Sequence, residues 1–268
     1  MSRVLIGVGV AAALGVAGCA HTSHYEANAF TWSGAVPAGQ WVHVHNTNGS
    51  ISVVAGTGAN VEVHASKRWM HNGDAVHFVE SAGPDGVTIC VLNRRGDRCS
   101  ADNNSDADRH HGLFMSRGHT DARVDFVVNV PAGVNVDLAS INGPVQSSGT
   151  SGTVEAKVVN GDINIASHQG ALDLVTVNGS VSAALDTLPA TGDISLKSVN
   201  GSITAVLPPQ LAGFVNLETV AGTVSNGFAV TSDGPVNPRH LSGTIGTGGT
   251  RHVDLSTVHG TVTLLKHA

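Results

Sequence analysis

The chain has 268 residues and a net charge of −6; 41% of its residues are hydrophobic and only 4% are aromatic. This apolar content at low net charge excludes a disordered chain, and 14 basic residues in an acidic chain argue against nucleic acid as a partner. The 33 glycines, set among many Val, Thr, Ser and Asn residues, favour an all-β protein with tight turns over a helical bundle.

The N-terminus has the pattern of an export signal. Arg3 precedes a 13-residue apolar stretch, Val4–Val16, which has the length of a signal-peptide core and is short for a transmembrane helix. Val16-Ala17-Gly18-Cys19 then resembles the lipobox of bacterial lipoproteins, in which the cysteine is lipidated and becomes the first residue after cleavage. An ordinary secretory signal with a chance cysteine is the alternative.

This resemblance implies a signal peptide over residues 1–18 and lipidation, including palmitate, at Cys19. Residues 19–40 are polar and mixed in character, so we expect them to form an acylated tether. Several acyl chains on one anchor bind a membrane stably. The expected location is the bacterial cell envelope, lipid-anchored at the outer membrane or facing the periplasm.

The stretch after the tether predicts strands interrupted by a polar excursion. Residues 42–53 read Val-His-Val-His-Asn-Thr-Asn-Gly-Ser-Ile-Ser-Val, and strand-like runs follow at 76–79, 87–92 and 124–130. The excursion covers residues 93–122. Because an exported chain meets an oxidising compartment, we expect Cys90 and Cys99 to form a disulfide.

An internal repeat dominates the remainder of the chain. Glycines recur every nine residues from Gly143 to Gly179, so the unit is about 18 residues long, in two halves. Its hallmark is a β-branched residue, usually an Asn, and a Gly. The six copies are Ser140-Ile141-Asn142-Gly143, Val158-Val159-Asn160-Gly161, Thr176-Val177-Asn178-Gly179, Ser198-Val199-Asn200-Gly201, Thr219-Val220-Ala221-Gly222 and Thr257-Val258-His259-Gly260.

Two folds can accommodate this repeat: a parallel β-solenoid (β-helix) and an antiparallel β meander or sandwich. In a two-residue hairpin, the β-branched residue two positions before each glycine lies opposite the other aliphatic residues. A bent solenoid corner instead turns this residue inward, as at Val177, together with Leu172, Leu174, Val181 and Ala183. We therefore predict a single-domain parallel β-solenoid over residues 41–268, with these valines in the core.

The corner itself is expected to be structural. Asn residues at one corner of successive coils lie about 4.8 Å apart, so their amides can hydrogen-bond along the axis. Gly accepts the positive φ that the corner needs. The predicted corner residues are Asn142, Gly143, Asn160, Gly161, Asn178, Gly179, Asn200 and Gly201.

With these Val-Asn-Gly-Ser-Ile-type turns and the Val130-Pro131 lead-in, the chain resembles a family of exported bacterial proteins, the candidate adhesins, a domain of unknown function. The resemblance covers residues 42–265. It implies a β-solenoid fold and adhesion at the cell surface, and it brings no catalytic residues.

Two outward-facing clusters are candidate sites. Asp137, Glu155 and Asp173 are spaced by 18 residues and stack on one face with Asp254, close to Lys157 and Lys197. Such a stripe suits a cation, a glycan, or the paired carboxylates of sugar cleavage. His43, His45, Glu62 and His64 alternate with inward valines and are a candidate Zn or Cu site if their strands are neighbours. In both clusters a plain solvated surface is the alternative.

Two further motifs have only a weak pattern. Asp102-Asn103-Asn104-Ser105-Asp106-Ala107-Asp108 is similar to the start of a calcium loop but lacks its Gly and Glu. Arg95-Gly96-Asp97 matches a cell-attachment tripeptide by letter only.

The sequence thus predicts a lipid-anchored envelope protein with a non-enzymatic binding, adhesion-like or structural role and no cofactor. Its expected partners are the membrane, through the anchor, and an envelope polysaccharide or surface protein. The alternatives are a polysaccharide lyase or hydrolase, and a periplasmic metal or stress sensor that uses the outward histidines.

Overall fold

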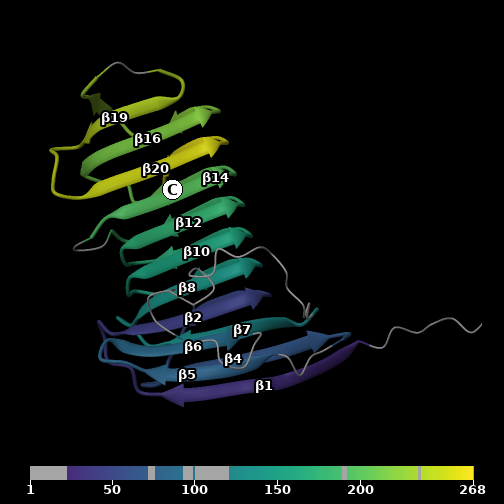
Figure 1. The fold of residues 1–268 in the computed structure, drawn as a ribbon. Coiled ribbons are helices and arrows are strands. Elements are labelled where there is room, and N and C mark those ends of the chain that lie inside the picture. Colours follow the sequence, from purple (N-terminus) through teal and green to yellow (C-terminus); the bar gives the residue numbers. More distant parts are fainter. Residues whose placement is uncertain are drawn as a thin grey trace, which may run out of the picture.

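A computed structural model describes residues 23–71, 76–92, 99, 121–188, 192–234 and 237–267. Over these ranges the regular structure is all β-strand, and no helix there is long and apolar enough to cross a membrane. The strands form two large sheets that enclose one hydrophobic core (Figure 1). Sheet A has ten strands in the order β1-β4-β7-β3-β9-β11-β13-β15-β21-β17, and sheet B has eleven in the order β18-β19-β16-β20-β14-β12-β10-β8-β2-β6-β5.

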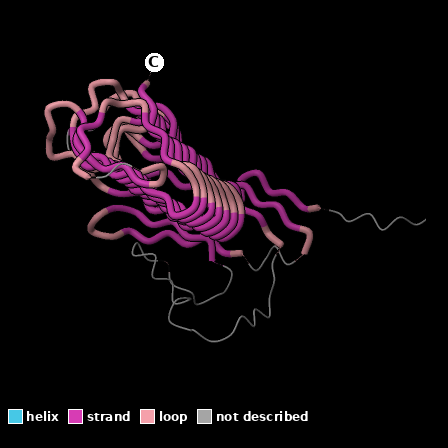
Figure 2. The backbone as a smooth tube through the Cα atoms, turned by 90° about the horizontal axis from the view of Figure 1, so that it is seen from above, coloured by secondary structure: helices cyan, strands magenta, loops and turns pink. Residues whose placement is uncertain are grey.

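The middle of the molecule is the predicted parallel solenoid. Each coil places one strand in sheet B, turns a corner, and places the next strand in sheet A; the corners of successive coils lie over one another in Figure 2. Neighbouring coils pair in parallel and in register, with Asn160 beside Asn178 and Asn178 beside Asn200. The strands of these coils are β8 (Asn135–Asn142), β9 (Val145–Ser148), β10 (Val154–Asn160), β11 (Ile163–His168), β12 (Leu172–Asn178), β13 (Val181–Leu185), β14 (Ile194–Asn200) and β15 (Ile203–Leu207).

The N-terminal part adds one coil and several antiparallel strands. The coil of β2 and β3 stacks directly on that of β8 and β9, although 79 residues separate Ala55 from Asn135. The N-terminal strands are β1 (His24–Gly34), β2 (Trp41–Asn48), β3 (Ile51–Ala55), β4 (Val61–Trp69), β5 (His77–Ala82), β6 (Gly86–Leu92) and β7 (Arg123–Val130).

One difference from the sequence-based expectation lies at residues 24–34. They fall within the segment expected to be a tether, yet they form β1, which pairs antiparallel with β4. The pairing covers the backbone edge that β4 would otherwise expose. Phe30 and Trp32 pack against the core, which gives the strand an apolar contact that the polar composition of the segment hides.

The C-terminal part is out of sequence order. The last coil, β20 and β21, inserts between the coil of β14 and β15 and that of β16 and β17 (Figure 1). Inward Val253 and Leu255 thereby continue the core rows of Ile194 and Leu196. The C-terminal strands are β16 (Gly213–Ala221), β17 (Val224–Asn226), β18 (Val230–Ser232), β19 (His240–Ile245), β20 (His252–His259) and β21 (Val262–Lys266).

The corner valines do not turn inward, so this part of the prediction is wrong. Their outward side chains range from 39% exposed at Val177 to 60% at Val220. The inward position next to the corner belongs to the preceding residue, which is Ser or Thr in most coils. Thr176 donates its hydroxyl to the carbonyl of Gly161 and Ser198 to that of Gly179, each at 2.9 Å. These hydroxyls satisfy corner carbonyls that an aliphatic side chain would leave unpaired.

The corner asparagines form the predicted ladder. The Nδ2 donors of Asn142, Asn160, Asn178 and Asn200 each reach the Oδ1 of the asparagine one coil below, at 2.8–3.0 Å, and Asn48 completes the ladder at its lower end.

The corner glycines have two different causes. A positive φ requires glycine at Gly143, where φ is 144°. At Gly179 the cause is close approach, because an added Cβ would lie 2.1 Å from the carbonyl oxygen of Gly161.

Candidate functional site

The outer face of sheet B carries three parallel rows of side chains, one residue from each strand. The row farthest from the corner holds the predicted carboxylates. Asp137 pairs with Glu155 and Glu155 with Asp173, as the repeat predicts. Ser195 then separates Asp173 from Asp254, so the acidic row is interrupted. We call this face, with its rows on strands β8, β10, β12, β14, β20 and β16, the ladder face.

The middle row of the ladder face supplies the positive charges. Lys157 and Lys197 lie in it, exposed, with Val175 between them. The Nζ of Lys197 lies 3.7 Å from the Oδ2 of Asp254 in the acidic row.

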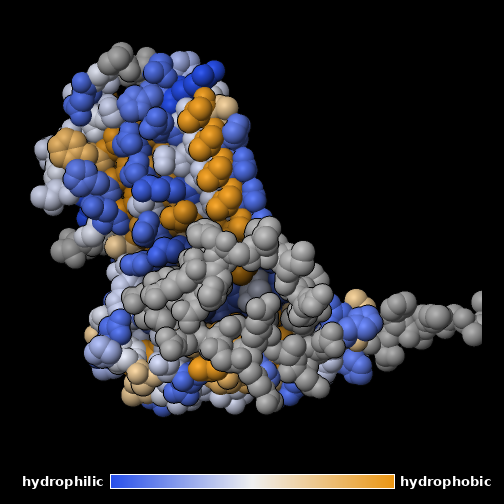
Figure 3. All heavy atoms as spheres, viewed as in Figure 1, coloured by the Kyte–Doolittle hydropathy of each residue, from blue (hydrophilic) through white to orange (hydrophobic). Residues whose placement is uncertain are grey.

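The third row is aliphatic and runs beside the Asn ladder. Figure 3 shows it as an orange stripe next to the blue corner residues. A contiguous exposed apolar row is unusual for a surface and is typical of a binding site. Its members are Ile141, Val159, Val177, Val199, Val258 and Val220.

Glu155 has the most perturbed environment in the middle of the acidic row. Partial burial raises the pKa of Glu155, the charge of Asp137 raises it further, and Lys157 opposes both. This carboxyl therefore keeps its proton to higher pH than an ordinary glutamate.

The predicted histidine cluster is divided between the two sheets, so that prediction is wrong as a single site. His43 and His45 lie on β2 in sheet B, whereas Glu62 and His64 lie on β4 in sheet A. The cause is that β4 pairs antiparallel with β1 and β7 and never neighbours β2. Glu62 and His64 line a separate pocket together with Trp32.

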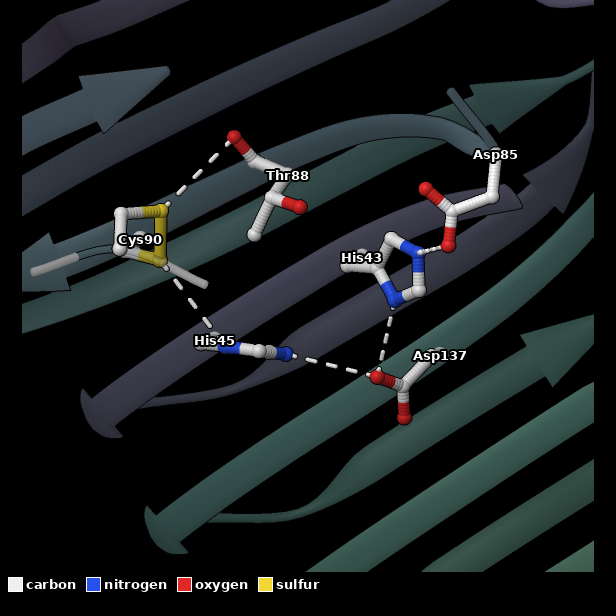
Figure 4. A network of polar contacts seen from close by, with 7 residues as sticks. His43, His45, Asp85, Thr88, Cys90 and Asp137 are labelled. Carbon is white, nitrogen blue, oxygen red and sulfur yellow. Dashed lines mark hydrogen bonds and ion pairs between the residues drawn. A yellow bond between two sulfur atoms is a disulfide. The ribbon is translucent and has the colours of Figure 1, made fainter. Parts of the chain in front are cut away.

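The structure instead joins the two β2 histidines to the first carboxylate of the acidic row (Figure 4). The Oδ2 of Asp137 lies 3.0 Å from the Nδ1 of His43 and 3.4 Å from the Nε2 of His45. The other ring nitrogen of His43, Nε2, lies 3.8 Å from the Oδ2 of Asp85 in the turn before β6. Alignment of residues 42–53 with the later repeats contains this signal, because it places His43 beside Asp137.

The cluster is shielded from water. Side-chain exposure is 9% for His43, 15% for His45 and 7% for Asp137. Burial alone would raise the pKa of Asp137, but hydrogen bonds from His43 and His45 lower it to about 2. Asp137 is thus a carboxylate at neutral pH. Its Oδ1 is buried and has no hydrogen-bond partner in the described part of the chain.

A disulfide joins Cys90 and Cys99, as the sequence predicts, and lies beside this cluster. The Sγ of Cys90 is 3.9 Å from the Nδ1 of His45. The bond occupies both sulfur atoms, so neither is a thiolate ligand.

Three sequence-predicted features lie outside the described residues. They are the lipidation residue Cys19, the tripeptide Arg95–Asp97 and the calcium-like segment Asp102–Asp108.

No curated protein matches the chain. Two solved structures are similar over most of its length. One is a candidate cell adhesion protein from Clostridium sporogenes, 13% identical, with 89% of this chain and 99% of that chain covered and a TM-score of 0.49. The other is a candidate adhesin from Bacteroides fragilis, 12% identical, with 88% and 96% covered and a TM-score of 0.40.

The sequence profile of one protein family matches residues 100–265, which is more than half of the chain. The matched region contains the regular coils and the out-of-order C-terminal coil. The chain belongs to the Toastrack DUF4097 family.

Proposed function

We propose that this protein is a lipid-anchored, non-enzymatic binding protein of the bacterial envelope that holds an extended envelope polysaccharide along the ladder face. The observation that carries the proposal is the in-register alignment of three chemically different rows on one open sheet face. A surface that repeats with every coil matches a ligand that repeats along its length.

The rows offer the contacts that a polysaccharide needs. The aliphatic row presents apolar surface to the ring faces of sugars, and the neighbouring Asn amides and the charged rows offer partners for hydroxyl groups. Stacked strands repeat about every 4.8 Å, a spacing comparable to one extended sugar residue. Each added coil therefore adds a similar set of weak contacts.

An enzyme remains the second candidate because Glu155, with its raised pKa, lies beside Asp173. Glycoside cleavage uses such pairs of carboxyl groups. The two pockets lined by described residues lie elsewhere, around Trp32 and around Arg239. Incubation of the full chain with the purified polysaccharide, followed by an assay for new reducing ends, separates the two candidates.

The anchor rests on the sequence motif that ends in Cys19. Cells that express the full chain and are fed an alkyne-labelled palmitate should incorporate the label into the protein. The variant Cys19→Ser should lose the label and leave the membrane fraction. Equal labelling of both proteins would contradict lipidation at this residue.

The binding surface is tested by a matched pair of charge insertions. Val177→Lys places a charged chain in the centre of the aliphatic row, whereas Ser182→Lys does the same at an exposed position of β13 in sheet A. In a sedimentation assay with insoluble envelope polysaccharide, we expect Val177→Lys to weaken binding at least about tenfold, or 1.4 kcal/mol. Ser182→Lys should bind as the wild type does. Equal binding by both variants would contradict the proposal.

A further inference from the structure

Three metal-ligating side chains converge where β2 pairs with β8, at one end of the ladder face. They are His43, His45 and Asp137, and their ligand atoms all lie within 4.8 Å of one another (Figure 4). We propose that these three residues bind one divalent transition-metal ion, with zinc as the best match. This site is independent of the proposed polysaccharide binding.

The distances suit a tetrahedral ion. Zinc lies about 2.0–2.2 Å from nitrogen and oxygen ligands, so two tetrahedral ligands are about 3.3–3.4 Å apart. The Oδ2 of Asp137 is 3.0 Å from the Nδ1 of His43 and 3.4 Å from the Nε2 of His45. Small side-chain rotations are enough to admit the ion between the three atoms.

Hydrogen bonding alone leaves this buried cluster incompletely satisfied. If both histidines donate to the same Asp137 oxygen, the His43 Nε2 becomes an acceptor that faces a second carboxylate, Asp85, at 3.8 Å. Both the His43 Nε2 and the Asp137 Oδ1 are buried without a hydrogen-bond partner among the described residues. Buried polar atoms of this kind are uncommon, and an unmodelled ion is one of their usual causes.

A bound ion reverses the proton assignment of His43. The Nδ1 would hold the ion, and the Nε2 would then carry the proton and point it towards Asp85. Metal-binding histidines commonly donate their second ring N–H to a carboxylate, which fixes the ring and strengthens the ligand. Asp85 is therefore assigned as the outer partner of His43, not as a ligand.

The donor set narrows the metal. Two imidazoles and one carboxylate suit zinc, copper, nickel or iron, whereas calcium and magnesium prefer all-oxygen sites. Cys90 is held in the disulfide and supplies no thiolate. Three protein ligands leave a fourth tetrahedral position for water or an external ligand.

The test uses the full chain without a histidine tag, loaded with zinc and dialysed. We expect one tightly held zinc ion per chain, quantified by elemental analysis, with the dissociation constant obtained by competition with a chelator. Asp137→Asn and the double variant His43→Ala/His45→Ala should each raise that constant at least about 100-fold. Asp85→Asn should raise it about 10–100-fold, as outer partners do.

The matched control is His64→Ala/His252→Ala, which removes two exposed histidines far from the cluster. It should retain the wild-type dissociation constant. With cobalt in place of zinc, the wild type should show tetrahedral d–d absorption without a sulfur-to-metal band.

Circular dichroism of each metal-free variant separates loss of ligands from loss of fold, and Asp137→Asn, which preserves side-chain volume, is the variant that decides. Failure of the wild type to retain zinc would overturn the site. So would unchanged affinity in folded Asp137→Asn, or equal losses in the control. None of these results depends on whether the ladder face binds polysaccharide.

Discussion

Asn178 donates its side-chain amide to the Oδ1 of Asn160, 2.9 Å away on the adjacent coil, and accepts the equivalent bond from Asn200. Each interior asparagine of the corner ladder thus binds both its neighbours. The backbone follows the same pattern, because the amide of Gly161 donates to the carbonyl of Asn178 at 2.9 Å. The ladder is therefore a device that fixes the register of one coil on the next.

Removal of one rung should destabilise the stack. Asn178→Ala breaks two side-chain hydrogen bonds at an exposed corner, and each typically contributes about 0.5–1.5 kcal/mol. We expect the free energy of unfolding in urea to fall by about 1–2 kcal/mol. Asn164→Ala, on the exposed side of β11, is the control and should change it by less than about 0.5 kcal/mol. An Asn178→Ala variant as stable as the control would show that the ladder contributes nothing to stability.

The opposite orientations of neighbouring apolar residues on β12 predict unequal effects. Leu174 is fully buried, so Leu174→Ala should lower the free energy of unfolding by about 2–5 kcal/mol. Val177 lies on the exposed aliphatic row, so Val177→Thr should change it by less than about 0.5 kcal/mol. Thermal or urea unfolding of the two variants measures the difference. A large loss in Val177→Thr would return this valine to the core and contradict the observed corner.

His168 predicts a pH dependence of stability. Its side chain is fully buried and its Nδ1 contacts the hydroxyl of Thr150 at 3.1 Å. Burial lowers the pKa of His168 below its ordinary value of 6.5. The unfolded chain therefore binds a proton that the folded chain refuses, and stability falls as the pH drops from 6.5 towards the folded pKa.

Urea unfolding at several pH values checks this effect. His168→Gln should reduce the pH slope of the unfolding free energy by up to about 1.4 kcal/mol per pH unit in that window. His64→Gln, at an exposed position, should keep the wild-type slope. Identical slopes for wild type and His168→Gln would show that His168 titrates normally in the fold.

Sequence periodicity predicted the solenoid because the residues that define it act locally. The 18-residue spacing of Asn142, Asn160 and Asn178 is also the coil period, so the Asn ladder and the acidic row both follow from counting. The direction of Val177 did not follow, because it depends on Thr176 capping a carbonyl of the neighbouring coil. The Ser or Thr that precedes the valine in most copies is the signal that identifies this arrangement.

Long-range order was beyond the periodicity. The insertion of β20 and β21 between earlier coils depends on which core rows fit best, and the repeat makes all coils nearly equivalent. The histidine cluster failed for a related reason. Alternation placed His43 and His64 outside, but only the pairing of β2 with β8 and of β4 with β1 assigns them to different sheets.

The most direct test of the binding surface is lysine footprinting of the full chain with and without purified envelope polysaccharide. Lys157 and Lys197 lie exposed on the ladder face, and Lys266 lies exposed at the end of β21 in sheet A. Mass spectrometry after brief acetylation measures the labelling rate of each lysine. We predict that the polysaccharide slows labelling of Lys157 and Lys197 several-fold and leaves Lys266 unchanged. Unchanged labelling of Lys157 and Lys197, or protection of Lys266 instead, would contradict polysaccharide binding on the ladder face.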